Sequence, residues 1–114
     1  MGLDMYLNKK IQIDCVGQWR KANQIHNWFV NNVQDGVDDC KEYYVSYSQL
    51  LDLKKLCEKA IKDKDASILP PKQGFFFGST EIDEYYWGNL VETIEMINSL
   101  NPDNGDSFYY RASW

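Results

Sequence analysis

The chain opens with an alternation of apolar and polar residues, which predicts a β-strand over about residues 3–13. Side chains at every second position of a strand point to one face of its sheet. Gly17 follows this segment, and we expect it to end the strand. The apolar positions of the alternation are Leu3, Met5, Leu7, Ile11 and Ile13.

Apolar residues at helical spacing then predict a first helix from about residue 18 to residue 33. Its apolar stripe includes Ala22, Ile25 and Phe29. The Asp-Gly pair at 35–36 has turn chemistry that would end this helix.

Two further helices are predicted downstream. Ser46 opens a capping box, in which its hydroxyl accepts from a first-turn backbone N–H, and the helix that follows runs to about residue 63. The third helix spans about residues 81–100, with Ser79 or Thr80 as its expected cap.

Short aromatic segments at 43–45 and 107–114 predict two more strands. Few and short strands between helices indicate an α+β fold, in which a small antiparallel sheet of about three strands is packed with three helices. A chain of 114 residues suits one domain, covering 1–114.

The formal net charge of −5 argues against a general nucleic-acid binder, which needs a basic surface. The acidic excess lies in the second half of the chain. Residues 65–114 contain only Lys72 and Arg111 as basic residues, against eight acidic ones. This half is expected to suit a partner with a basic surface.

The cysteine pattern and the chain start indicate a cytoplasmic setting. The 3 cysteines have no close pairing, which predicts free thiols in a reducing compartment. The first residues do not have the charged-then-apolar order of a signal peptide, and no apolar run approaches the length of a membrane span.

Familiar catalytic and metal motifs fit the chain poorly. A calcium loop beginning at Asn31 would place Val33 where an oxygen ligand belongs. A thiol nucleophile at Cys40 would sit beside Asp38 and Asp39, which disfavour a thiolate. We therefore expect no metal site, no cofactor and no enzymatic activity; a hydrolase using His26 is the least favoured hypothesis.

One polar cluster is a candidate ligand site. In the predicted first helix, Arg20, Asn23 and His26 stand at successive steps of three on the exposed edge. With nearby aromatic side chains they could bind a small planar ligand such as a nucleotide. The alternative is a buried polar network that fixes the helix orientation. The further residues assigned to this ligand site are Trp28, Tyr109 and Arg111.

Several strings of the sequence resemble a widespread family of small, mostly uncharacterised bacteriophage and prophage proteins. They are MGLDMYL at the start, WRKAN-x-IH-x-WFV-x-NVQ-x-G at 19–36, CKEYYVS at 40–46, GFFFGST at 74–80 and FYYRASW at the end. The resemblance covers nearly the whole chain and implies a phage origin and expression in a bacterial cytoplasm. It implies no reaction.

Small phage proteins of this size often block a host protein, so the resemblance favours an inhibitor of an anti-phage defence component, anti-CRISPR or similar. The acidic, aromatic surface would bind a basic host protein, with no direct nucleic-acid or membrane binding. A nucleotide-binding sponge is the alternative. Exposed aromatic strands also suggest a homodimer, because strand edges can pair between chains. The residues assigned to partner binding are Glu81, Asp83, Glu84, Tyr85, Trp87, Asp38 and Asp39.

Overall fold

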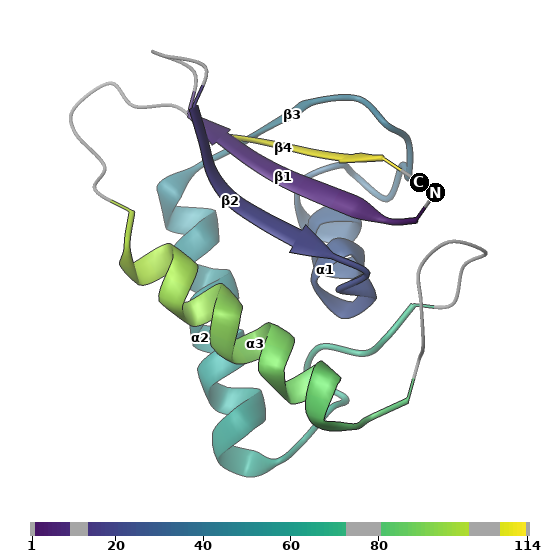
Figure 1. The fold of residues 1–114 in the computed structure, drawn as a ribbon, viewed down its shortest axis with the longest axis vertical. Helices are drawn as coiled ribbons and strands as arrows, with labels where there is room; N and C mark the ends of the chain where they lie inside the picture. The colour runs from purple at the N-terminus through teal and green to yellow at the C-terminus, as the bar shows by residue number, and fades with distance from the viewer. Residues whose placement is uncertain (1, 10–13, 73–80, 101–107, 114) are drawn as a thin grey trace.

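The chain forms a four-stranded antiparallel sheet with three helices on one face (Figure 1). The computed structural model describes residues 2–9, 14–72, 81–100 and 108–113. This architecture confirms the predicted α+β class, with four strands in place of about three. In chain order the elements are β1 (Asp4–Lys9), β2 (Asp14–Arg20), α1 (Asn23–Asn32), β3 (Tyr43–Val45), α2 (Tyr47–Asp63), α3 (Glu84–Asn98) and β4 (Phe108–Ser113).

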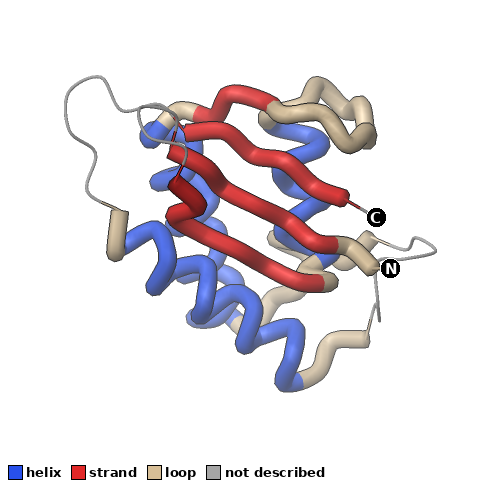
Figure 2. The backbone as a smooth tube through the Cα atoms, turned by 45° about the horizontal axis from the view of Figure 1, so that its top comes forward, coloured by secondary structure: helices blue, strands red, loops and turns tan. Residues whose placement is uncertain are grey.

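The sheet brings the two ends of the chain together at its centre. Its strand order is β2-β1-β4-β3, so β1 and β4 pair with each other and each also pairs with an edge strand. In Figure 2, α1 and α2 lie behind the sheet and α3 runs along its β2 edge. One face of the sheet therefore builds the core, while the other, here called the open face, is not covered by any helix among the described residues.

Alternation along the central strands explains this division. Leu3, Met5 and Leu7 are fully buried beneath the helices, as the sequence pattern predicted. Tyr110 of β4 is also fully buried, and its ring stacks on that of Phe29 from α1, with the centroids 3.8 Å apart. Burial of these side chains supplies most of the driving force for folding.

The prediction that Gly17 ends a strand and that a helix begins near residue 18 was wrong. Residues 14–20 form β2, and Trp19 is buried as a strand residue opposite Met5. Gly17 belongs to the strand because the side chain of Met96 packs where a Cβ atom would stand. Of the predicted first strand, residues 10–13 lie outside the described residues.

The helix ends follow local capping chemistry. The capping box at Ser46 is confirmed: its Oγ accepts from the Gln49 N–H at 3.1 Å, and the Gln49 side chain accepts from the Ser46 N–H at 2.9 Å. The third helix starts later than predicted. Its N-cap is Asp83, whose carboxylate accepts from two first-turn N–H groups, while residues 79–80 lie outside the described residues.

Candidate functional site

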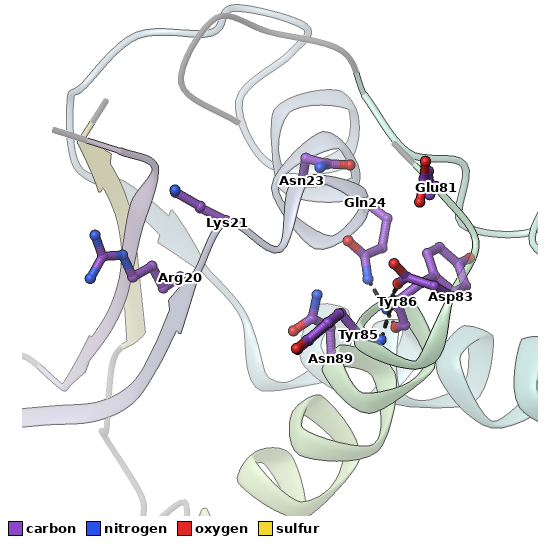
Figure 3. A pocket seen from close by; sticks show the side chains of 9 residues that line it. All are labelled: Arg20, Lys21, Asn23, Gln24, Glu81, Asp83, Tyr85, Tyr86 and Asn89. Carbon is purple, nitrogen blue, oxygen red and sulfur yellow. Dashed lines mark hydrogen bonds between the residues drawn. The ribbon is translucent and has the colours of Figure 1, made fainter. Parts of the chain in front are cut away.

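A pocket of about 320 Å³ lies between the junction of β2 with α1 and the beginning of α3 (Figure 3). Its volume is at the lower end of the range usual for small-molecule sites. Polar groups and two tyrosines line it. The lining residues are Arg20, Lys21, Asn23, Gln24, Glu81, Asp83, Tyr85, Tyr86 and Asn89.

The first wall is made where the chain leaves β2 and enters α1. Lys21 turns the chain with φ of 55°, and its N–H donates to the carbonyl of Leu3 at 2.8 Å. The N-cap position of α1 is Ala22, and no side chain caps this helix start. Because a helix start carries partial positive charge, this end of the pocket favours an anion.

The opposite wall is the start of α3. The Asp83 carboxylate accepts from the N–H groups of Tyr85 and Tyr86 at 3.1 and 3.2 Å. The Tyr86 hydroxyl donates to the carbonyl of Leu69 at 2.6 Å, and burial raises the pKa of Tyr86 to about 12. Tyr86 is therefore a structural anchor, whereas the Tyr85 side chain is 75% exposed at the pocket rim.

One buried amide, that of Gln24, connects the walls, and a second, that of Asn23, ties α1 to the segment that follows α2. The Asn23 Oδ1 accepts from the Lys72 N–H at 3.0 Å, and the Gln24 Nε2 donates to the Tyr86 carbonyl at 3.2 Å. Both side chains are almost fully buried. Because they hold α1 against its neighbours, the pocket is preformed rather than assembled by a ligand.

Charge is divided across the pocket. Figure 3 shows the start of α1 with Asn23 and Gln24 on one side and Glu81 and Asp83 on the other; the side chains of Arg20 and Lys21 stand at the rim and are directed away from the two acids. An anionic group would be stabilised at the first side, and hydrogen-bond donors at the second. The pocket is thus suited to a compact ligand that carries both.

The residues predicted to bind a ligand are distributed over different parts of the fold. Arg20 and Asn23 line the pocket. Trp28 borders a smaller hollow of about 110 Å³, and Tyr109 and Arg111 lie on β4. The prediction that Arg20 and Asn23 stand on the exposed edge of a helix was wrong, since Arg20 is in a strand and Asn23 is buried.

His26 belongs to a buried network of polar side chains. Its Nδ1 lies 2.6 Å from the Tyr110 hydroxyl, and its Nε2 lies 2.8 Å from the Asp38 carboxylate. A carboxylate only accepts, so Nε2 carries the proton and Nδ1 accepts from the hydroxyl. His26 and Tyr110 are fully buried, and burial raises the pKa of Tyr110 well above its ordinary value. The network links α1, the following loop and β4. It resembles the buried-network alternative at His26, whereas Arg20, which that alternative included, is exposed.

This network predicts a stability change near pH 6.5. Burial lowers the pKa of His26, although the hydrogen bond and charge of Asp38 partly oppose that effect. Below pH 6.5 the unfolded chain binds a proton that the folded chain does not. The stabilisation is therefore complete above pH 6.5 and is lost progressively as the pH falls below that value. Urea unfolding from about pH 7 to about pH 5 should show this loss.

The variant His26→Asn is the comparison for this measurement, because His26 is the chain's only histidine. Its unfolding free energy should lack the component that appears just below pH 6.5 in the natural chain. Identical pH dependence in the two proteins would contradict the linkage.

The residues predicted to bind a partner protein also lie in different parts of the fold. Glu81, Asp83 and Tyr85 line the pocket, and Glu84 is exposed in the first turn of α3. Trp87 is half-buried with its ring against Tyr86. The two remaining acids, Asp38 and Asp39, serve local contacts: with His26 in one case, and with the hydroxyl of Tyr43 in the other.

Four pocket residues were missed by sequence reasoning: Lys21, Gln24, Tyr86 and Asn89. Lys21 stands inside the WRKAN string and Gln24 directly follows it, so a signal was present for Lys21 alone. Tyr86 is buried on the apolar face of α3, where its residue type indicates a core position and not a binding site. Asn89 gave no signal, because an isolated polar residue in a helix usually faces water.

The remaining chemical features of the described ranges are few. Cys57 is buried, which raises the pKa of its thiol to about 12, and Cys40 is an exposed free thiol. Across residues 2–9, 14–72, 81–100 and 108–113, potential metal ligands do not gather in groups of three or more. Within the same ranges, no helix has both the length and the apolar surface that crossing a bilayer requires.

Comparison of the chain with protein-family models, with curated proteins and with solved structures gave no match. Functional assignment therefore depends on the geometry of the pocket and of the surfaces around it.

Proposed function

We propose that this protein binds a small polar ligand in the pocket between α1 and α3, without chemical turnover. The observation that carries the proposal is a preformed pocket with the uncapped start of α1 on one side, Glu81 and Asp83 on the other, and Lys21 at its rim. Asn89 supplies an amide, which can both donate and accept. A ligand with an anionic group at one end and hydrogen-bond donors at the other meets all of these groups.

Nucleoside monophosphates with an exocyclic amino group belong to this class. The phosphate would lie toward Lys21 and the start of α1, where positive charge gathers. The amino group would donate toward Glu81, and Tyr85 would pack against the base. The resemblance to phage proteins suggests the setting: in the cytoplasm of an infected bacterium, sequestering a nucleotide signal would weaken an anti-phage response.

A panel of nucleotides measured by thermal unfolding tests this proposal. Adenosine and cytidine monophosphates should raise the melting temperature, because a ligand that binds only the folded state stabilises it. Uridine monophosphate lacks the amino group and adenosine lacks the phosphate, so each should have a smaller effect. Equal shifts for all four compounds, or none, would contradict the proposed mode of binding.

Charge reversal at Lys21 gives a matched comparison. The variant Lys21→Glu should weaken adenosine monophosphate binding about tenfold at low salt, because the phosphate would then face a carboxylate. Lys55→Glu makes the same change in net charge at an exposed position of α2. This variant should bind adenosine monophosphate as the natural chain does. Equal weakening in both variants would show a general charge effect and not a pocket.

A second function, inhibition of a host protein, is favoured by a separate observation on the surface. Ile82, Tyr85 and Val91 are 46%, 75% and 44% exposed at the start and along the outer face of α3. Exposed apolar side chains among carboxylates are typical of a docking surface for a basic protein. The acids that accompany them in exposed positions are Glu81, Glu84, Glu92 and Glu95.

The inhibitor hypothesis predicts that Glu84→Lys with Glu92→Lys abolishes capture of a basic host protein, such as a nucleic-acid-binding defence protein, from bacterial lysate. Asp83 must be left intact in this test, because it caps α3. The control is Asp52→Lys with Glu58→Lys, which makes the same change in net charge at exposed positions of α2. Unchanged capture by the double variant would exclude this surface.

A further inference from the structure

The open face of the sheet carries three tyrosines and two arginines. Leu3, Met5 and Leu7 point into the core, so their neighbours in β1 point to the opposite side. The same alternation holds in β4, where Phe108, Tyr110 and Ala112 are buried. The side chains on the open face are Asp4, Tyr6 and Asn8 of β1, Gln18 and Arg20 of β2, Tyr44 of β3, and Tyr109, Arg111 and Ser113 of β4.

These side chains form one connected surface. Tyr6 stands opposite Arg111, whose guanidinium lies 5.3 Å from the centre of the Tyr6 ring. Tyr109 stands opposite Tyr44, and their rings are 5.8 Å apart. Asn8 is paired with Tyr109 in the register, so Tyr6 and Tyr109 are diagonal neighbours, about 7–8 Å apart at the backbone.

The charge of this face differs from that of the whole chain. It holds the cations Arg20 and Arg111 against the single carboxylate of Asp4, which pairs with Arg20 at 3.8 Å. The remaining chain therefore carries the acidic excess, because the formal net charge is −5. An anionic ligand that also has flat, stacking groups would find its best complement here.

We propose that the open face of the sheet, formed around Tyr6, Tyr109 and Arg111, binds single-stranded nucleic acid. Bases would stack on the two tyrosine rings, and the guanidinium of Arg111 would pair with a phosphate. The amides of Asn8 and Gln18 supply donors and acceptors for base edges. The whole-chain charge predicted no nucleic-acid binding; the local charge of this face leads to the opposite expectation.

The size of the face favours a thin ligand over a second protein. Four strands of about six residues cover roughly 400 Å², and β3 has only three residues. A stable protein interface needs about 800 Å² on each partner. Two or three nucleotides fit on this area, whereas a second copy of the chain would leave its interface undersized.

Fluorescence anisotropy of labelled octauridylate, at low salt, tests the proposal. The natural chain should bind it, and Tyr6→Ala and Tyr109→Ala should each weaken binding about tenfold. Tyr6→Phe and Tyr109→Phe keep the rings and should bind within about threefold of the natural chain. Circular dichroism and thermal unfolding of each variant establish that it is folded.

Salt dependence gives an independent measure. With two arginines available, the slope of log affinity against log salt should be about −1.4 or shallower. Asn89 lines the pocket and is not part of the open face. Asn89→Ala should therefore leave octauridylate binding unchanged, which distinguishes binding on the open face from binding in the pocket.

Four outcomes would overturn the proposal. They are no anisotropy change up to about 1 mM protein, equal binding of a duplex of the same length, alanine variants that bind like the natural chain, and a steeper salt slope. Size exclusion with light scattering tests whether a second copy of the chain binds the open face instead. A dimer that Arg111→Glu dissociates would assign this face to dimerisation and overturn the proposal.

Discussion

Replacing His26 with alanine is expected to lower the free energy of unfolding by about 3 kcal/mol. The imidazole is fully buried and bonded at both nitrogens, to the Tyr110 hydroxyl and the Asp38 carboxylate. Its removal leaves that hydroxyl buried without an acceptor and opens a void beside the ring of Tyr110, whose centroid lies 5.9 Å from that of His26. Both effects destabilise the folded state, and urea denaturation measures their sum.

Two further variants separate the parts of this loss. Tyr110→Phe removes the hydroxyl but keeps the stacked ring, and should cost about 1 kcal/mol. Asn27→Ala, on the same helix and only half-buried, should change stability by less than about 0.5 kcal/mol. If His26→Ala were as mild as Asn27→Ala, the network would not stabilise the fold in the way described.

Filling the pocket at Asn89 is expected to weaken binding of adenosine monophosphate about 100-fold, because the ligand and the new ring would need the same space. Asn89 lines the pocket from α3 and is half-buried there, so Asn89→Phe would direct an aromatic ring into the cavity. The fold should persist, since Thr93 bonds the backbone carbonyl of Asn89 and not its side chain.

The matched control is Glu92→Phe, which adds the same ring to the exposed face of the same helix. It should bind the nucleotide as the natural chain does. Isothermal titration of both variants measures the difference directly. Equal affinities for Asn89→Phe and the natural chain would show that the ligand binds elsewhere.

The sequence predicted the elements whose signals are local. Ser46 and its partner three residues on fixed the start of α2, and apolar spacing identified most of α3. β2 was missed because Ala22 fits the helical stripe of Ile25 and Phe29, and because a glycine at position 17 is typical of a strand end. Only the packing of Met96 over Gly17 explains a glycine inside that strand, and such a contact cannot be read from one chain.

The site was less predictable than the fold. Arg20 and Asn23 were assigned to a ligand and Glu81 and Asp83 to a protein partner, yet all four line one pocket. Their proximity depends on how α1 and α3 pack, which periodicity does not determine. His26 could not be distinguished from a surface residue either, because its burial depends on Tyr110 from the last strand.

The central claim is that the pocket between α1 and α3 holds a nucleotide, and NMR titration of the isotope-labelled protein with adenosine monophosphate tests it most directly. At 13.4 kDa every backbone amide can be followed separately. The largest shifts should fall on residues 20–24 and 85–89, including the side-chain amide of Asn89. Shifts confined to other parts of the chain, or none at saturating nucleotide, would contradict the claim.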